Sequence, residues 1–153
     1  MRVIIGSDHG GYELKKDLVP LLKDLGHEVV DFGTHSTEPV DYPDIAALVA
    51  TAVAREPGGN TVGIMIDGAG TGSAITANKV PGVRAAACYD TFTARNSREH
   101  NHANMLTLGS RNTGIEVAKE IVKTWLSASF GGSRHMRRIE KMLQVERRFM
   151  RDA

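Results

Sequence analysis

Two apolar runs each end in residues that could move a proton. Asp8 and His9 follow the run over residues 2–6, and Asp67 follows the run over residues 62–66. Asp67 opens a loop with glycine at every second position, followed by a serine: Gly68, Gly70, Gly72 and Ser73. Such a loop brings backbone N–H groups close to a ligand, and the positive end of the following helix favours negative charge there. The loop therefore predicts a site for an anion or a developing oxyanion, with Asp67 as its one ionisable side chain.

Further candidates follow later in the chain. His100 and Asn101 lie in the polar segment over residues 98–104, and Arg111 follows the apolar run over residues 105–108. Ligands bind at the carboxyl ends of strands in open parallel sheets, so we expect all of these residues near one edge, together with Asp8 and Asp67. A carboxylate, an imidazole and an anion-binding loop would supply the base, acid and oxyanion site needed for proton transfer beside a carbonyl.

Each residue taken alone also has a plainer interpretation. Asp67 could tie down a turn or cap the next helix, and His100 could be a surface or capping residue. The pair His100 and His102 lacks the further ligands of a credible metal site. The glycines after Asp67 are spaced one residue closer than a dinucleotide fingerprint requires. The sequence therefore favours neither a metal nor a nucleotide cofactor.

A basic stripe lies near the C-terminal end, in a helix predicted over about residues 134–151. Arg134, Arg137, Arg138 and Lys141 are three or four residues apart, which places them on one side of that helix. Two arginines four apart can hold a phosphate with paired N–H donors. A solvated face is one alternative. A nucleic-acid surface is another, which the net charge of +1 and a single neighbouring aromatic, Phe149, disfavour.

The elements that must position these residues alternate along the chain. Apolar runs at residues 2–6, 28–32, 62–66, 84–88 and 105–108 predict strands, and helical spacing predicts helices at residues 14–25, 45–55 and 115–126. Asp44 is placed to cap the second of these helices. Parallel strands need crossover connections, so the alternation predicts a three-layer α/β/α fold around a five-stranded parallel sheet, with the basic helix at the C-terminal end.

Composition limits the class of protein. With 153 residues, charged residues at 24% and a net charge of +1, the chain fits one domain over residues 1–153, without a bias toward nucleic acid or membrane. No apolar run approaches the roughly 20 residues that span a bilayer. The single cysteine, Cys88, excludes an internal disulfide and is expected to be a buried packing residue. With no signal peptide expected, a reducing cytoplasm is the predicted compartment.

Five motifs together resemble one known family. They are residues 7–11 (SDHGG), 68–79 (the glycine loop to Asn78-Lys79), 98–104 (REHNHAN), 108–111 (LGSR) and 134–138 (RHMRR). In this order and spacing, over nearly the whole chain, they resemble the ribose-5-phosphate isomerase B and galactose-6-phosphate isomerase family. The resemblance implies a Rossmann-like domain that dimerises, draws each active site from both subunits, and interconverts aldose and ketose phosphates through an enediolate without metal or nucleotide.

The resemblance also implies roles for single residues. Asp8 and His9 would contact the sugar, Tyr42 would line its site, and His100 would assist ring opening. The enediolate oxygens would be held by Asn101 and the loop, that is Gly68, Gly70, Gly72 and Ser73. The phosphate would be bound by three arginines, Arg111, Arg134 and Arg138.

This chain departs from the family at the reacting carbons. The family's base is usually a Cys at the position of Asp67 or a Glu at the position of Ser73, and a Thr or Ser stands at the position of Ala69. Asp67 is the one acid or base left on the loop and is therefore assigned as the base.

The predicted reaction is ribose 5-phosphate to ribulose 5-phosphate, within the pentose phosphate pathway of carbohydrate metabolism. Isomerisation of another sugar phosphate, such as a tetrose or a galactose-6-phosphate-like hexose, and a non-catalytic sugar-phosphate sensor are the alternatives. The expected partners are the sugar phosphate and a second copy of the chain, as a homodimer or a dimer of dimers, with no nucleic acid and no membrane.

Overall fold

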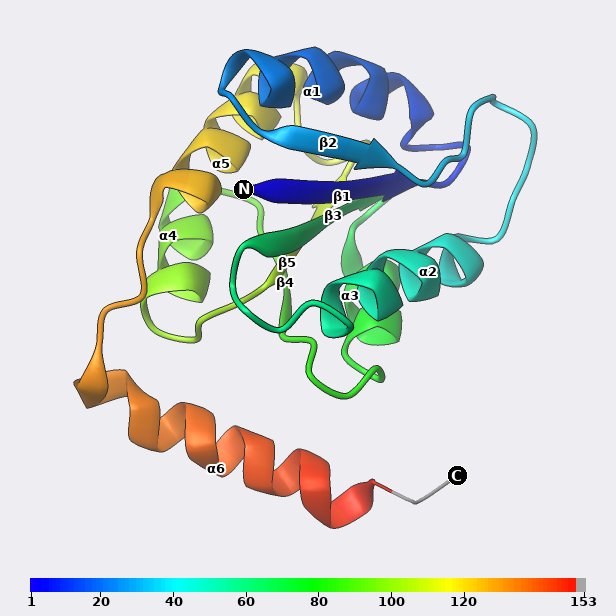
Figure 1. The fold of residues 1–153 in the computed structure, drawn as a ribbon. Coiled ribbons are helices and arrows are strands. Elements are labelled where there is room, and N and C mark those ends of the chain that lie inside the picture. The colour runs from blue at the N-terminus through cyan, green and yellow to red at the C-terminus, as the bar shows by residue number, and fades with distance from the viewer. Residues whose placement is uncertain (151–153) are drawn as a thin grey trace.

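A computed structural model describes residues 1–150 of the chain (Figure 1). Strands and helices alternate until the last two helices. The elements are β1 (Arg2–Ser7), α1 (Tyr12–Asp24), β2 (Glu28–Asp31), α2 (Tyr42–Ala54), β3 (Thr61–Asp67), α3 (Thr71–Ala77), β4 (Ala85–Ala87), α4 (Thr91–Glu99), β5 (Met105–Gly109), α5 (Ile115–Ser127) and α6 (Ser133–Phe149).

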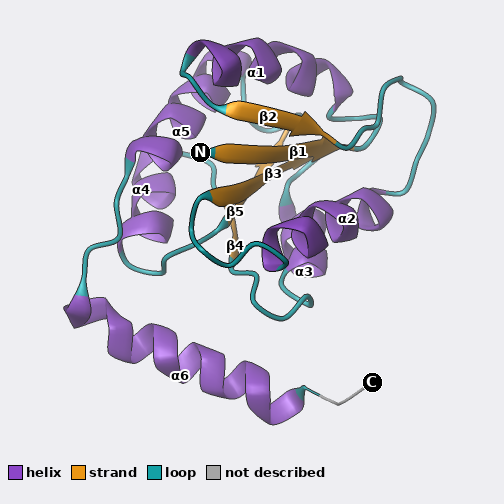
Figure 2. Cartoon of the chain, in the orientation of Figure 1, coloured by secondary structure: helices purple, strands orange, loops and turns teal. Residues whose placement is uncertain are grey.

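The five strands form one parallel sheet in the order β2-β1-β3-β5-β4. Helices cover both faces: α1, α4 and α5 lie on one face, and α2 and α3 lie on the other (Figure 2). This arrangement confirms the predicted three-layer α/β/α fold with a five-stranded parallel sheet. The predicted strand limits differ from the observed ones by at most one residue at each end, and β4 is the shortest strand, with three residues.

Side chains of the central strands alternate between the two helical layers, as the pleat requires. Ile64 and Ile66 of β3 pack with α1 and α5, whereas Met65 packs with α2. Asp67 shares the parity of Met65, so its side chain starts on the side of α2 and α3. The pleat thereby brings this carboxylate to the beginning of α3.

The second predicted helix begins three residues earlier than expected, at Tyr42. Pro43 fits the first turn of a helix, where a backbone N–H has no partner to lose. The prediction that Asp44 caps this helix is wrong: Asp44 lies in the first turn, and the N-cap residue is Asp41, whose side chain makes no capping hydrogen bond. Asp44 still stabilises the helix, because its negative charge lies near the N-terminus, the positive end of the helix dipole.

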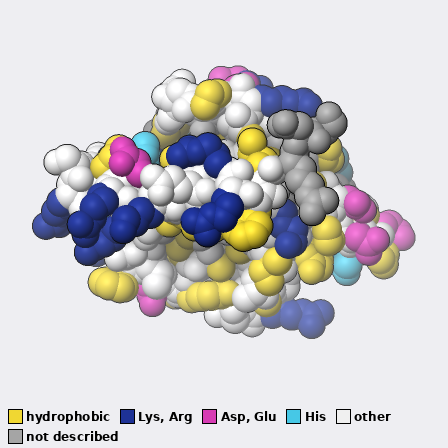
Figure 3. Space-filling model, turned by 90° about the horizontal axis from the view of Figure 1, so that it is seen from below, with side chains coloured by type: hydrophobic (Ala, Val, Ile, Leu, Met, Phe, Trp, Pro, Cys, Tyr) yellow, Lys and Arg dark blue, Asp and Glu magenta, His cyan; other side chains and the backbone are white. Residues whose placement is uncertain are grey.

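The basic helix α6 leaves the body of the protein after Gly131 and Gly132 and runs beside it (Figure 1). Of its 17 residues only His135 and Ile139 are buried. On the face of the molecule on which α6 lies, Lys and Arg side chains lie next to exposed hydrophobic side chains (Figure 3). Arg151, where the prediction ended this helix, lies outside the described residues. None of the helices within residues 1–150 is both long enough and apolar enough to cross a membrane.

The packing of β1 against α2 makes a test of the fold. A Cβ atom added at Gly6 would lie 2.7 Å from Cγ2 of Ile45 and 2.9 Å from Cγ2 of Val49. We expect Gly6→Ala to lower the free energy of unfolding by about 1–3 kcal/mol, the usual cost of overpacking a core. Urea denaturation measures this loss. Gly58→Ala is the matched control, because nothing lies within 4 Å of its added Cβ, and an equal loss in both variants would contradict the packing described.

Candidate active site

An open cleft of about 340 Å³ lies beyond the carboxyl ends of β1, β3 and β5. The residues around it come from the three loops that follow these strands: Asp8, His9, Gly10, Gly68, Ala69, Arg111 and Asn112. The structure thus brings Asp8, His9 and Arg111 together with the glycine loop. Backbone hydrogen bonds hold the loops in this arrangement, since the Ser110 N–H donates to Asp67 O (2.8 Å) and the Arg111 N–H to Gly68 O (3.0 Å).

Asp67 directly precedes Gly68 and Ala69, which line this cleft, and is 5% exposed. Its Oδ1 accepts a hydrogen bond from the N–H of Gly70, and its Oδ2 accepts one from the N–H of Ser73 at 3.3 Å. Gly70 has φ +81°, and a Cβ there would meet the backbone of Leu108 at 3.0 Å, so this turn needs glycine. Two N–H groups of the loop therefore bind the chain's own carboxylate, and the binding of a ligand anion by this loop stays a prediction.

Other N–H groups of the same loop have no acceptor within residues 1–150. Those of Thr71 and Gly72 lie in the first turn of α3, where a helix offers no acceptor, and they have no hydrogen-bond partner within residues 1–150. The ring of Tyr42 covers Gly72 so closely that an added Cβ would lie 2.4 Å from its Cε1. Tyr42 thus lies beside the loop, as a residue that lines the site must.

His9 links the cleft to the segment before α2. Its Nδ1 lies 3.1 Å from the N–H of Val40 and 3.2 Å from Val40 O, and the tautomer decides whether it accepts or donates. Asp8 is held from the other side, where its Oδ1 accepts from the Gly11 N–H at 3.0 Å. Both side chains are therefore oriented by backbone groups.

The expectation that His100 and Asn101 share this edge of the sheet is wrong. They follow the helix α4, which returns the chain to the edge where the strands begin. The next residues confirm this position, because Asn104 O accepts from the N–H of Gly63 near the start of β3. Asp67 is four residues further along β3, roughly 13 Å away at about 3.3 Å per strand residue.

His100 belongs instead to a second polar cluster, where α4 ends and α6 begins. Its ring stacks on that of His135, with centroids 4.1 Å apart. Arg134 donates from Nε to Nε2 of His135 (3.1 Å), and the N–H of Gly131 donates to Glu99 O (2.8 Å) and joins the two helices. Burial lowers the pKa of His135, and the nearby His100, Arg134 and Arg138 lower it further.

Several residues near the cleft and near the His100–His135 cluster were not predicted from the sequence. Lys15 is 1% exposed and donates to Asp31 (2.7 Å) and to Thr34 O, which anchors the segment that leads to Tyr42. Its signal in the sequence was a lysine between apolar helix positions. Tyr89 donates its hydroxyl to Ala69 O (3.1 Å), and nothing in the sequence pointed to that contact. His135 could have been noted, because it is flanked by the arginines of the basic stripe.

Two other features bear on what the site can hold. Within the described residues, no group of three or more His, Cys, Asp or Glu side chains is placed to hold a metal ion. Another hollow, of about 500 Å³, lies between α6 and the body and is lined mainly by apolar side chains such as Val83, Met142 and Leu143. Asp8, His9 and Arg111 do not line this hollow but lie around the cleft at the strand ends, so that cleft is the candidate active site.

Comparison with known proteins places this geometry in a family. The family model described as Ribose/Galactose Isomerase matches residues 3–142. The chain is 45% identical to ribose-5-phosphate isomerase B of Escherichia coli (strain K12) over 148 residues, which cover 96% of this chain and 97% of that protein. The solved ribose-5-phosphate isomerase B of Clostridium thermocellum matches with a TM-score of 0.94 and 51% identity, over 98% of this chain and 100% of that one.

A further solved structure contains a ligand. Ribose-5-phosphate isomerase B from Mycoplasma genitalium, with bound ribulose-5-phosphate, matches with a TM-score of 0.91 and 41% identity, over 95% of this chain and 96% of that one. The relatives therefore agree with this chain in length and in fold.

The contact between His135 and Arg134 generates a prediction about titration. Burial and the neighbouring charges favour neutral His135, so its ring should titrate with a midpoint below the ordinary value of about 6.5. Arg134→Ala should raise this midpoint by removing a positive charge, whereas Arg134→Lys should leave it low. A pH series of NMR spectra that follows the ring protons measures it. Because the unfolded chain binds this proton more readily, His135 should lower stability as the pH falls through about 6.5. An unchanged midpoint in Arg134→Ala would contradict the described contact.

Proposed function

The chain belongs to the ribose/galactose isomerase family, and we propose that residues 1–153 form a single isomerase domain that converts ribose 5-phosphate to ribulose 5-phosphate. The observation that carries this proposal is the position of Asp67, a carboxylate at the end of β3 that two loop N–H groups fix. It directly precedes Gly68, which lines the cleft together with Asp8, His9 and Arg111. Relatives named ribose-5-phosphate isomerase B support the choice of substrate.

In this proposal Asp67 is the base that moves the proton. A carboxylate oxygen has two lone-pair positions, so each oxygen of Asp67 can accept an N–H and still accept a proton from carbon. Asp67 takes the proton from the carbon beside the carbonyl and returns it to the neighbouring carbon. The N–H groups of Thr71 and Gly72, in the first turn of α3, would stabilise the negative oxygen of the enediolate between these two steps.

The roles of the other predicted residues divide between two subunits. Asp8, His9, Tyr42 and Arg111 would bind the sugar phosphate from the chain that supplies Asp67. Ring opening by His100, the contact of Asn101 with the enediolate, and phosphate binding by Arg134 and Arg138 would come from a second copy. The separation of the two clusters along the sheet supports this division, because one chain cannot bring them together.

A homodimer also accounts for α6. This helix leaves Met142, Val145 and Phe149 exposed, by 43%, 50% and 73%, and an apolar helix face of this kind normally packs against a partner. A two-fold axis would place each α6 at the other chain's cleft and form two equal sites. A dimer of dimers is compatible with the same surfaces. Because Cys88 is free and buried, a reducing compartment such as the cytoplasm remains our expectation.

Two features of the glycine loop each favour an alternative function: isomerisation of another sugar phosphate, or sugar-phosphate sensing without catalysis. Ala69 offers no hydroxyl beside the reacting carbons, which favours another sugar phosphate, such as a tetrose or a hexose. The two N–H bonds to Asp67 would also suit a structural carboxylate, which favours a non-catalytic sugar-phosphate sensor. An assay over pentose, tetrose and hexose phosphates in deuterated water separates these functions, since an isomerase labels the carbon beside the carbonyl and a sensor binds without labelling.

The base has a direct test. Asp67→Asn keeps the shape of the side chain but cannot accept the proton, so we expect kcat to fall roughly 10²–10⁴-fold with substrate binding retained. Steady-state kinetics and solvent-deuterium incorporation should fall together. Cys88→Ser is the control and should stay active, because the Cys88 side chain is buried, away from the cleft, and burial raises the pKa of its thiol. Turnover of Asp67→Asn within tenfold of the parent would rule out Asp67 as the base.

Shared sites have a separate test. His100→Ala and Asp67→Asn each disable both sites of their own homodimer, but a mixed dimer would contain one site with both residues intact. We expect activity to return when the two inactive proteins exchange subunits, toward a quarter of the parent level, because about half of the dimers are mixed and each has one of two sites. Labelled subunits establish that exchange has occurred. No recovery after proven exchange would mean that the two residues do not act across subunits.

A further inference from the structure

Two half-buried arginines hold the segment that carries His100 and Asn101. Arg84, directly before β4, donates from Nε to Asn101 O (3.2 Å) and His102 O (3.1 Å) and from Nη2 to His102 O (2.8 Å). Arg98 in α4 donates from Nη1 to Ala103 O (2.6 Å) and lies over the ring of Trp125. Three consecutive carbonyls of this segment therefore point at guanidinium groups.

Neither guanidinium group forms an ion pair with a carboxylate in the part of the chain that the structure describes. Within residues 1–150 neither Arg84 nor Arg98 has an acidic oxygen within 4.0 Å, although Glu146 of α6 is near enough to stabilise the charge of Arg84 in part. A half-buried charge without a counter-ion is costly unless its N–H groups find acceptors. The carbonyls are the acceptors that Arg84 and Arg98 have, although Arg98 Nε has none. Moving these carbonyls would leave half-buried charges without hydrogen bonds.

The segment over residues 100–103, which the two arginines hold, contains a backbone conformation that is unfavourable on its own. His102 has φ +48°, in the left-handed region that a side chain other than glycine disfavours. Its ring stacks on Phe130, with centroids 4.6 Å apart, and its carbonyl accepts two of the bonds from Arg84. Contacts with Phe130 and Arg84, which lie outside this segment, therefore stabilise the turn beside His100 and Asn101.

We infer that Arg84 is a positioning residue for the isomerisation: its bonds to Asn101 O and His102 O aim His100 and Asn101 at the substrate bound to the partner chain. The inference rests on the proposed function. Arg84 itself lies at the starting edge of the sheet and does not reach the cleft of its own chain. Its planar fork spans two carbonyls at once, which a lysine ammonium on a flexible stem cannot do with the same geometry.

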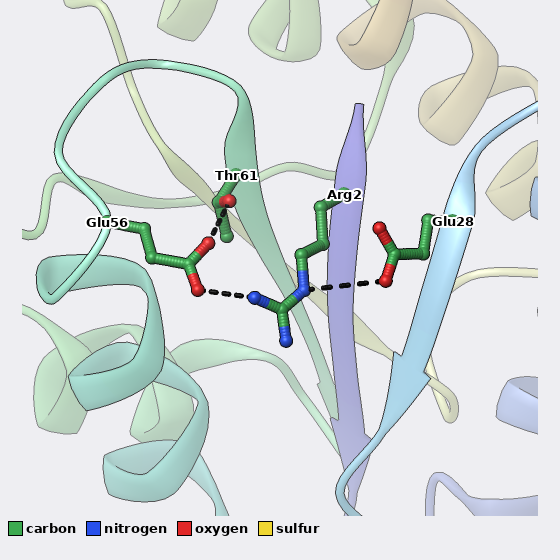
Figure 4. A network of polar contacts seen from close by, with 4 residues as sticks. All are labelled: Arg2, Glu28, Glu56 and Thr61. Carbon is green, nitrogen blue, oxygen red and sulfur yellow. Dashed lines mark hydrogen bonds and ion pairs between the residues drawn. The ribbon is translucent and has the colours of Figure 1, made fainter.

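Arg84→Lys therefore keeps the charge and removes the fork. We expect kcat to fall about tenfold or more with KM for the sugar phosphate within about twofold, because a small misplacement of a catalytic group costs rate more than binding. Arg2→Lys is the matched control. Arg2 lies at the same edge, between Glu28 and Glu56, with Glu56 also bonded to Thr61 (Figure 4). It contacts no residue assigned to the site, so its kcat should stay within about twofold of the parent.

A mixed dimer separates positioning from general destabilisation. The one working site of the Asp67→Asn/His100→Ala mixed dimer uses Asp67 of the His100→Ala chain and His100 of the Asp67→Asn chain. Arg84→Lys should abolish most of the recovered activity when added to the Asp67→Asn chain, and should have little effect when added to the His100→Ala chain. Equal effects in the two placements, or no effect in either, would overturn this inference while the proposed function stands. An inactive parent would overturn the proposed function, and the inference with it.

Discussion

The direction of parallel βα units is the constraint on which the rest of this structure depends. A helix that joins two parallel strands must return the chain to the edge where strands begin. Residues at the end of β3 and residues at the end of α4 are therefore held a strand length apart. Asp67 and His100 cannot approach each other within one chain unless the sheet is broken. Any chemistry that uses both needs two copies, and the exposed apolar face of α6 offers a surface for the second.

The carboxylate of Asp67, at the end of β3, limits which N–H groups of the glycine loop are free to bind a ligand. Asp67 takes the N–H groups of Gly70 and Ser73, two donors that could otherwise hold a ligand oxygen. These bonds fix the direction of the carboxylate, which favours proton transfer at a defined position, since a base must lie within hydrogen-bond reach of its proton. In the proposed mechanism, binding of the enediolate oxygen would then fall to the N–H groups of Thr71 and Gly72. The loop would orient the base with one pair of N–H groups and stabilise the intermediate with another.

Much of the fold could be predicted from the sequence, because it rests on local periodicity. Continuous apolar runs indicate the strands, which are buried almost throughout in β1, β3 and β5. Helical spacing indicates α1, α2 and α5, and the rule for strand ends correctly placed Asp8, His9 and Arg111 at one cleft. The same rule failed for His100 and Asn101, since it applies to residues that follow a strand and these follow a helix. Contacts such as those of Lys15 with Asp31 and of Tyr89 with Ala69 join residues far apart in sequence, and no local pattern encodes them.

The basic stripe of α6 could be predicted from local spacing, and the proposed function gives it a role in binding the substrate phosphate. Arg134, Arg137, Arg138 and Lys141 make no ion pair within residues 1–150, so their like charges repel one another on a helix that the body of the protein scarcely contacts. Such a stripe weakens the isolated chain. In the proposed dimer, a substrate phosphate held between Arg111 of one chain and Arg134 and Arg138 of the other would neutralise part of that charge. Substrate binding and subunit association would then stabilise each other, because a ligand that contacts both chains favours the state in which both are present.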